Sequence, residues 1–401
     1  MKMSSEDKTK QALHWILESI GTSNLKVNFK TREDNLEGFM ADTLLAEVIL
    51  QNGEVLYLFI KIGRMNLKSK APIVTDCSKR EIYFYRNVVS SYQRFLQEKN
   101  LSEKDFLSIP KCYKTFLSDT EEVIVLEDIK PKGYQLFNRH LPMNLSHIKM
   151  VLTSLAKLHS ISFALKAQKQ DEFAKLTENY SSLLGKNMDF YRDSFNNRLD
   201  KLIEKLQFYH KNIQADKVKK LKKSDIIDIL QRIINDNPQE AIVLHGDSHN
   251  NNFLFQYKDS NTEHPSKLIM VDFQLSFLHS PVIDLSYFWH FVASTQEYPH
   301  LTELLEFYHK ELSTNLNLLG CNSDELFSLD TLWTHWKKYS LYGFIQAVLF
   351  TYLLYVDHED LQKINDGSQG TKVQKLVGVQ LKNDEAYVQR ISALIDYYKL
   401  D

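Results

Sequence analysis

The first apolar pattern along the chain has the period of a helix. Leu13, Ile16, Leu17 and Ile20 recur at intervals of three and four residues, which places them on one helix face. Gly21 follows at once, and glycine commonly ends a helix because it adopts left-handed backbone angles without strain. The spacing therefore predicts an amphipathic helix that ends at Ile20.

Beyond this helix the pattern becomes that of strands. Two apolar runs, 43–50 and 55–62, are separated by residues 51–53, and the Asn-Gly pair in this gap is a strong hairpin signal. The further elements expected here are a helix that contains Glu81, Phe84 and Val88 and two strands at 111–117 and 122–126. The first ~130 residues thus predict an antiparallel sheet with one inserted helix.

After residue 133 the pattern is mainly helical. Apolar positions at 148–155 and 226–234 have helical spacing, and Ser224 is expected to cap the second of these helices. Residues 201–223 contain eight lysines, which indicates a solvated helix face or a mobile excursion. Short strands are expected at 241–244, 252–256 and 268–272, and helices from Leu301 to the end.

Residues 339–356 raise the question of a membrane span, because 18 residues pass there without a formal charge. A helix needs about 20 apolar residues to cross a bilayer. The segment also contains serine, glutamine, threonine and four tyrosines. A buried helix is therefore favoured, and no membrane partner is expected.

Composition narrows the class of protein. A length of 401 residues suits one large bilobal domain or two domains. A hydrophobic content of 43% and a charged content of 25% are ordinary for a globular chain and exclude a disordered or fibrous one. The net charge of −2 offers no general attraction for nucleic acid, so no nucleic-acid partner is expected.

The cysteines and the N-terminal residues indicate the compartment. Cys77, Cys112 and Cys321 lie far apart and lack the spacing of a zinc site or a disulfide framework. The first ten residues are polar and show no secretory signal. We therefore expect a reduced, cytoplasmic protein.

The candidate chemistry lies in two short segments, each preceded by an apolar run. Residues 245–252 read HGDSHNNN, and residues 271–274 read VDFQ. Phosphoryl transfer needs a carboxylate that takes the proton of the acceptor hydroxyl, and an amide oxygen and a second carboxylate that hold Mg²⁺ against the phosphates. Singly, such residues more often cap turns, but the ordered set favours Asp247 as the base and Asn252 and Asp272 as ligands of Mg²⁺.

These segments carry a family resemblance. His-Gly-Asp-x4-Asn, followed by an aspartate at a strand end, resembles the catalytic and metal-binding loops of the aminoglycoside phosphotransferase and choline kinase group. Three further segments, LED at 126–128, KPKGY at 130–134 and SPVIDL at 280–285, make the chain similar to the ecdysteroid kinase-like family over roughly residues 25–360.

The resemblance implies an α+β, bilobal, protein-kinase-like fold. Residues 1–128 would form the N-terminal lobe, an antiparallel sheet with one key helix that grips the nucleotide phosphates. Residues 129–401 would form a mainly helical C-terminal lobe with the catalytic loop, the metal site and the acceptor site. The implied cofactors are ATP and Mg²⁺, and the implied state is a monomer.

Kinase chemistry also needs a lysine on a central strand and a helix glutamate that orients it. Lys61 lies in the apolar run 58–62, where a charge is costly without a partner. Glu81, on the following predicted helix, is the expected partner, and both are assigned to catalysis. The alternative is an edge-strand lysine that reaches water.

The resemblance further implies where the nucleotide binds and what supports the loop. Gly38 would lie over the phosphates, although a simple turn residue is the alternative. Asp284 would hydrogen-bond the catalytic loop, with a helix cap as its alternative, and His245 would brace that loop. The hinge that receives adenine would consist of Leu126, Glu127 and Asp128.

The acceptor is predicted from residues 331–356, which contain no Asp or Glu. A cationic acceptor would need carboxylates or an aromatic cage, so a neutral hydroxyl compound is favoured, an ecdysteroid first and a xenobiotic alcohol or glycoside second. The alternative for the rings of this segment is core packing. They are Trp333, Trp336, Tyr339, Tyr342, Phe344, Phe350, Tyr352 and Tyr355.

The prediction is therefore an ATP- and Mg²⁺-dependent small-molecule O-kinase. One alternative keeps the enzyme class but makes choline, an aminoglycoside or a sugar the acceptor. Another is a catalytically silent pseudokinase that serves as a binding module, which the complete catalytic set disfavours. A protein kinase is least favoured, because the Asp-Phe-Gly, Ala-Pro-Glu and activation-loop patterns are missing.

Overall fold

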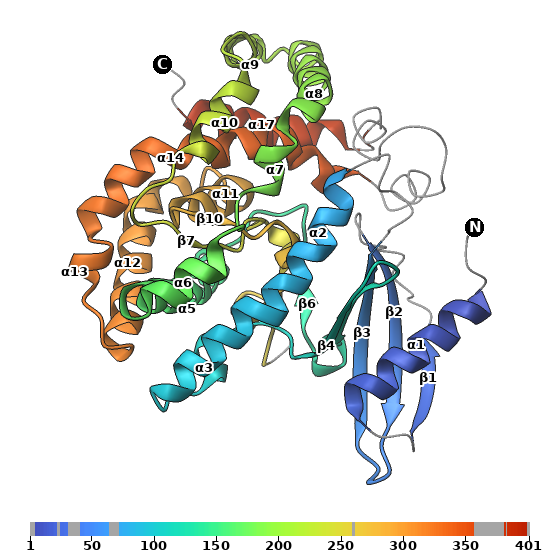
Figure 1. Cartoon of the computed structure of the whole chain (residues 1–401). Coiled ribbons are helices and arrows are strands. Elements are labelled where there is room, and N and C mark those ends of the chain that lie inside the picture. Colours follow the sequence, from blue (N-terminus) through green and yellow to red (C-terminus); the bar gives the residue numbers. More distant parts are fainter. Residues whose placement is uncertain are drawn as a thin grey trace.

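The computed structural model describes residues 5–21, 25–30, 41–63, 72–258, 261–356, 381 and 383–398. A strand-rich N-terminal part lies beside a larger helical part, and a long helical run crosses between them (Figure 1). Gly38, the predicted phosphate-loop glycine, lies outside the described residues.

Five antiparallel strands form the N-terminal sheet, in the order β1-β2-β3-β5-β4. The predicted hairpin is confirmed, because Ile49 pairs with Val55 across the turn that contains Gly53. The edge strand β1 was not predicted. The elements are α1 (Ser5–Ile20), β1 (Lys26–Lys30), β2 (Ala41–Ile49), β3 (Val55–Gly63), β4 (Cys112–Leu117) and β5 (Glu122–Glu127).

One face of this sheet is covered by α1, as Figure 1 shows. Trp15 and Ile16 on α1 share an apolar cluster with Leu58 of β3 and Val123 of β5. Burial of such side chains is worth roughly 1.5–3 kcal/mol each, which is the main force that holds the helix on the sheet. Gly21 ends α1 at a positive φ of 74°, as the sequence predicted.

The predicted inserted helix is a continuous helical run of three segments. They are α2 (Pro72–Tyr83), the π-helical segment η2 (Phe84–Val89) and α3 (Ser90–Glu98), and a short helix, α4 (Glu103–Phe106), follows. Phe84 and Val88 belong to the main core, which α2 shares with the helical part of the chain. Glu81 lies one turn before the π-helical segment, on the side that faces the sheet through Lys61.

The rest of the chain is mainly helical and carries two small sheets, β6-β8-β9 and β7-β10. The predicted boundary between the two lobes, after residue 128, lies just beyond the end of β5. Its role as a domain boundary stays a prediction. The elements are η3 (Lys130–Lys132), β6 (Gln135–Leu136), α5 (Leu145–Gln168), α6 (Gln170–Thr177), α7 (Leu183–Lys186), α8 (Met188–Phe208), α9 (Asn212–Lys223), α10 (Ile226–Asn235), β7 (Ile242–Val243), η4 (Asn250–Asn252), β8 (Phe253–Gln256), β9 (Lys267–Met270), η5 (Phe273–Leu275), β10 (Leu278–His279), α11 (Val282–Val292), η6 (Tyr298–His300), α12 (Leu301–Leu318), α13 (Ser323–Leu326), α14 (Leu329–Phe350), η7 (Thr351–Tyr355) and α17 (Asp384–Tyr397).

Two long apolar helices lie inside this part of the protein. In the described part of the chain, α5 alone is long and apolar enough to cross a bilayer, and 78% of its most apolar stretch is buried within the protein. The segment 339–356 forms the end of α14 and η7, and it is largely buried, as predicted. Both helices therefore have the burial that is typical of core helices.

The lysine-rich segment forms the end of α8 and all of α9, so the solvated-helix interpretation is confirmed. Its lysines form ion pairs with nearby aspartates: Lys205 with Asp384 at 2.5 Å, Lys217 with Asp396 at 3.2 Å and Lys222 with Asp200 at 2.5 Å.

The predicted cap of the next helix is wrong. Asp225 caps α10, because its carboxylate accepts hydrogen bonds from the N–H groups of Ile227 and Asp228. Ser224 instead ends α9, where its N–H donates to the Lys220 carbonyl. Both neighbours are good capping residues, but Ser224 already ends α9, so the chain enters α10 through Asp225, whose φ is 51°.

Candidate active site

The HGDSHNNN segment forms a tight loop between β7 and β8. Gly246 adopts a φ of +81°, and a Cβ at this position would lie 2.1 Å from the carbonyl oxygen of Leu275. Only glycine satisfies both conditions, since other residues are strained at this φ and would overlap that backbone. The loop is thus held directly against the segment that follows Asp272.

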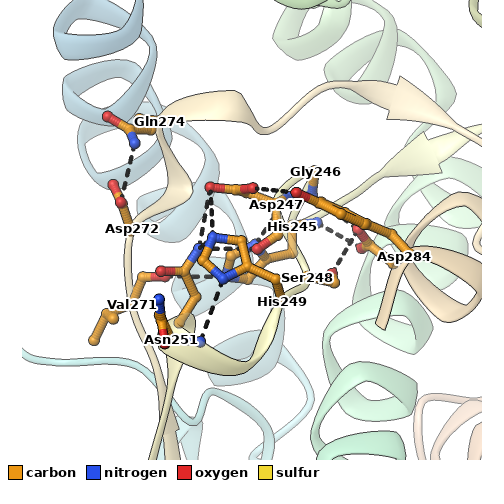
Figure 2. Close-up of polar contacts among 12 residues, drawn as sticks. His245, Gly246, Asp247, Ser248, His249, Asn251, Val271, Asp272, Gln274 and Asp284 are labelled. Atoms are coloured by element: carbon orange, nitrogen blue, oxygen red, sulfur yellow. Dashed lines mark hydrogen bonds and ion pairs between the residues drawn. The ribbon is translucent and has the colours of Figure 1, made fainter. Parts of the chain in front are cut away.

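Asp284 holds the loop from the other side, as Figure 2 shows. Its carboxylate accepts hydrogen bonds from the N–H of His245 at 2.7 Å and the N–H of Gly246 at 2.9 Å. The hydroxyl of Ser248 donates at 2.8 Å, and Nε2 of His159 lies at 3.1 Å. The predicted contact with the loop backbone is confirmed.

The helix-cap alternative for Asp284 is wrong, because Asp284 lies inside the first turn of α11 and Pro281 occupies the cap position. Burial alone would raise the pKa of Asp284, but its donors, His159 first, outweigh burial and hold the pKa below its ordinary value. His159 lies on α5, and nothing in its local sequence indicated this contact.

Asp247 lies at the centre of the loop with donors on both oxygens. The side-chain amide of Asn252 donates to its Oδ2 at 3.1 Å, and Nε2 of His249 lies 3.5 Å from the same oxygen. The hydroxyl of Tyr287 donates to its Oδ1 at 3.2 Å. Burial would raise the pKa of Asp247, but His249 and the other donors outweigh burial and lower it, which favours the charged carboxylate.

His245 braces the loop, as predicted. Its Nε2 lies 3.1 Å from the carbonyl oxygen of Val271, and its Nδ1 accepts from the N–H of Asp247 at 3.3 Å. This pattern assigns the proton of the neutral ring to Nε2. Burial lowers its pKa, so the imidazole stays neutral and holds the two loops together.

Lys61 lies on β3, which has β2 on one side and β5 on the other, so the edge-strand alternative is wrong. Its ammonium lies 2.5 Å from Oε2 of Glu81 and 2.6 Å from Oδ1 of Asp272. Burial opposes the charge of Lys61, but the two carboxylates outweigh it and raise its pKa above the ordinary value. The predicted Lys61–Glu81 ion pair is confirmed.

Glu81 is almost completely buried, with 1% of its side chain exposed. Burial raises its pKa to about 7, although Lys61 favours the charged form. The contact with Lys61 opposes this effect of burial, and the buried ion pair joins α2 to β3.

Asp272 is the more exposed acid of the pair that contacts Lys61, with 28% of its side chain accessible. It has a left-handed backbone with a φ of 68°, which is costly for a residue with a side chain and is often found at functional sites. Its Oδ2 accepts from the side-chain amide of Gln274 at 3.0 Å (Figure 2).

A cation site can form between Asp272 and Asn252. The N–H of Val271 donates to the carbonyl of Asn252 at 3.0 Å, which ties the two segments together. The amide nitrogen of Asn252 is turned to Asp247, which leaves its amide oxygen for a cation. No group of three His, Cys, Asp or Glu residues able to hold a metal occurs among the described residues. This donor set suits Mg²⁺, which commonly completes its shell with phosphate oxygens and water.

The predicted adenine hinge lies where β5 ends. The N–H of Glu127 donates to the carbonyl of Lys111 and the N–H of Asp128 to that of Tyr57, both at 2.8 Å. Leu126 is buried in the sheet. Since two of these N–H groups are already bonded, a base bound here has to use carbonyl groups or residues beyond 128. The hinge assignment stays a prediction.

The rings of residues 331–356 mostly pack the protein core. Tyr339, Tyr342, Phe344, Tyr352 and Tyr355 are buried. The packing interpretation is therefore correct for these five, because their faces are covered by other core side chains.

Two rings of α11 lie beside the catalytic loop. Tyr287 and Phe291 lie within 6.1 Å and 5.9 Å of the His249 ring, measured between centroids. The sequence prediction missed both residues. The available signal was the spacing, since Tyr287 follows Asp284 by three residues and so shares its helix face.

Residues 56–321 match the ecdysteroid kinase-like family. The chain belongs to this family. Among curated proteins, no sequence matches it.

Solved structures of similar fold include small-molecule kinases. A choline kinase from Cryptosporidium parvum Iowa II is 13% identical, covers 97% of this chain and 95% of its own, and has a TM-score of 0.50. An ethanolamine kinase from Plasmodium vivax is 14% identical, with coverages of 98% and 89% and a TM-score of 0.43. The GDP complex of aminoglycoside 2'-phosphotransferase-IIIa is 13% identical, with coverages of 94% and 98% and a TM-score of 0.44.

Family membership and the choline kinase fold confirm the predicted α+β, bilobal, protein-kinase-like fold. Family membership also confirms the enzyme class, a phosphotransferase with an alcohol group as acceptor in a family of small-molecule kinases. The roles given to single residues rest on the geometry above and stay predictions.

Proposed function

We propose that this chain is an ATP- and Mg²⁺-dependent O-kinase that phosphorylates a hydroxyl of a small, neutral, mostly apolar molecule. One observation carries the proposal: Lys61 joins Glu81 and Asp272 in a single ion-pair group. The loop of Asp247 is fixed beside this group through the contact between Gly246 and Leu275. A pseudokinase is disfavoured, because the chain contains all five residues of the expected catalytic set, namely Lys61, Glu81, Asp247, Asn252 and Asp272.

Each residue has a role that follows from its surroundings. Lys61 binds the α- and β-phosphates, and Glu81 keeps its ammonium in place. Asp272 and Asn252 would hold Mg²⁺, which supplies positive charge to the phosphate oxygens. Asp247 orients the acceptor hydroxyl and takes its proton.

Phosphoryl transfer from ATP to the acceptor needs no catalytic group beyond these. The acceptor oxygen forms a bond to the γ-phosphorus with one of its electron pairs. The bond from that phosphorus to the bridging oxygen breaks, and its electrons leave with ADP. The hydroxyl proton goes to the carboxylate of Asp247, whose lowered pKa keeps it charged before the reaction.

The charges near Asp247 support a neutral acceptor. The acid of α11, Asp284, is buried and fully used by the catalytic loop. From residue 331 to the end of α14 the helix contains no acid. A cationic acceptor would thus find no free carboxylate on α11 or in residues 331–350 to offset its charge, whereas a neutral acceptor needs none. An ecdysteroid is the first candidate, and a xenobiotic alcohol or glycoside the second.

A screen of acceptors tests the proposal. The purified full chain is incubated with ATP and Mg²⁺ and with ecdysteroids, other steroids, plant phenols, glycosides, choline or kanamycin-type amines, and products are detected by the mass of an added phosphate. Phosphorylation of a neutral compound, lost in Asp247→Asn, is the expected result. Turnover of choline or kanamycin alone would refute the neutral acceptor, and the absence of both turnover and ATP binding would refute the kinase.

We also propose a cytoplasmic location. All three cysteines are unpaired, which supports a reducing compartment. Fractionation of cells that express the tagged protein tests this proposal, and recovery in a secreted or membrane fraction would contradict it.

A further inference from the structure

The carboxylate of Asp247 is held between two donors on opposite sides. On the metal side, Oδ2 accepts from the amide of Asn252 and lies near His249. On the other side, Oδ1 accepts from the hydroxyl of Tyr287 at 3.2 Å. Because Oδ2 has these two neighbours, Oδ1 is the oxygen that can offer a remaining lone pair to an acceptor hydroxyl.

The position of Tyr287 is fixed by the close packing of α11 and α14. A Cβ at Gly343 would lie 2.4 Å from the backbone nitrogen of Tyr287, so these two helices touch through their backbones. The ring of Tyr287 makes edge contacts with Phe291 at 4.9 Å and Tyr342 at 6.3 Å. These contacts restrict the ring of Tyr287 and hold its hydroxyl beside Asp247.

The same helix also holds the backbone of the catalytic loop. Asp284 lies one turn before Tyr287 and bonds the N–H groups of His245 and Gly246. Residues of α11 thus determine both where the loop runs and how the carboxylate of Asp247 is turned. A base needs both conditions, since its proton transfer depends on distance and on angle.

The phenol of Tyr287 remains a donor under working conditions. Burial, together with the charge of Asp247, raises its pKa well above the ordinary value of a tyrosine. The phenol thus keeps its proton, and its hydrogen bond to a charged carboxylate is of the stronger kind.

We propose that Tyr287 is a positioning residue for phosphoryl transfer, whose hydroxyl holds the Asp247 carboxylate with Oδ1 turned toward the acceptor hydroxyl. This inference rests on the proposed function, in which Asp247 is the base. It assigns to α11 a part in the chemistry beyond the support of the loop.

Tyr287→Phe removes the hydroxyl and keeps the ring. The chain offers a matched control in Tyr339→Phe, because the hydroxyl of Tyr339 also donates to a carboxylate, that of Asp236 at 2.9 Å, and its ring is also buried. We expect Tyr287→Phe to lower kcat by about ten- to a hundredfold, as the loss of one hydrogen bond to a charged group would do. The KM for ATP should stay within about twofold of the wild type.

In the control, kcat should stay within about twofold of the wild type while the melting temperature falls by as much as in Tyr287→Phe. A kcat for Tyr287→Phe equal to that of the control would overturn the inference. If Tyr287→Phe does not fold, Tyr287→His, which keeps a ring and an N–H donor, takes its place, with kcat expected within about tenfold of the wild type. A loss as large as in Asp247→Ala would then overturn the inference.

A double variant shows whether Tyr287 acts through Asp247. In an Asp247→Ala background the phenol has no carboxylate to orient, so adding Tyr287→Phe should lower the residual rate by less than about twofold. An equal loss in both backgrounds would mean that Tyr287 acts only on the stability of the helix, and would overturn the inference.

The measured rate is phosphorylation of whichever acceptor the wild type uses, or ATP hydrolysis with water as the acceptor. A wild type that shows neither rate overturns the proposed function and this inference with it. A wild type that shows one of them while Tyr287→Phe is unaffected overturns this inference alone.

Discussion

Replacing Gly246 by alanine tests how closely the loop that carries Asp247 packs against the segment after Asp272. Gly246 has a φ of +81°, and an added Cβ would lie 2.1 Å from the carbonyl oxygen and 2.7 Å from the carbonyl carbon of Leu275. Both contacts are with backbone, so no side-chain rotation can relieve them. The two loops would have to move apart by about 1 Å.

The chain contains a control for the conformational part of this effect. Gly53 has a φ of +82° in the β2–β3 turn, and a Cβ there would meet nothing within 4 Å. Left-handed backbone costs a residue with a side chain roughly 1–2 kcal/mol, and both variants carry this loss. Overpacking adds roughly 1–3 kcal/mol at Gly246 alone. We expect a loss of about 1–2 kcal/mol for Gly53→Ala and about 2–5 kcal/mol for Gly246→Ala.

Urea unfolding of both variants measures the two losses as changes in midpoint at constant slope. Calorimetry of MgATP binding adds a functional readout, because Leu275 lies three residues after Asp272. Gly246→Ala should weaken MgATP binding, whereas Gly53→Ala should leave it unchanged. Equal stability losses in the two variants, with normal MgATP binding by Gly246→Ala, would refute the close packing of these loops.

Three further predictions concern the base, the metal and acid stability. Asp247→Asn should lower turnover by orders of magnitude with ATP binding nearly intact, because proton acceptance acts in the transition state; near-wild-type kcat would remove Asp247 from that role. Asp272→Ala should raise the Mg²⁺ concentration that activity requires and weaken MgATP binding, and Asn252→Ala should do so more mildly. If the wild type binds ATP independently of metal, these two residues are not Mg²⁺ ligands. Burial lowers the pKa of His279 and of His290 to about 4. Between pH 6.5 and 4 the unfolded chain therefore binds more protons than the folded chain, so the free energy of unfolding should fall as pH is lowered. In urea titrations at several pH values, His290→Gln should reduce the slope of this free energy against pH by up to about 1.4 kcal/mol per pH unit, and an unchanged slope would contradict the lowered pKa of His290.

The amino-acid sequence by itself determined the elements whose signals are local. The Asn52-Gly53 turn pairs the two strands that the apolar runs on either side of it predicted. Gly21 ends the first helix, and the spacing of Asp247 and Asn252 places both side chains in one loop. These features depend on backbone preferences and on periods of a few residues, so they can be predicted without knowledge of the rest of the chain.

Contacts between distant segments could not be predicted in this way. His159 and Asp284 meet at 3.1 Å although 125 residues separate them. Arg80 is buried and donates to the carbonyl of Ser276 at 2.5 Å and to that of Ser181 at 3.0 Å, which ties α2 to two other loops. A buried arginine or histidine has no local pattern of its own, because its partners are selected by the packing of whole elements.

The aromatic residues show this limit most directly. Rings on α14 and rings on α11 have the same apolar character in the sequence, yet most of the former pack the core and Tyr287 reaches Asp247. Apolar spacing indicates only that a helix face is covered. Whether that face packs against a neighbouring helix or against a loop with a charged carboxylate is decided by the tertiary structure. The hydrophobic effect is non-directional, so the final contacts depend on shape and on hydrogen-bond partners.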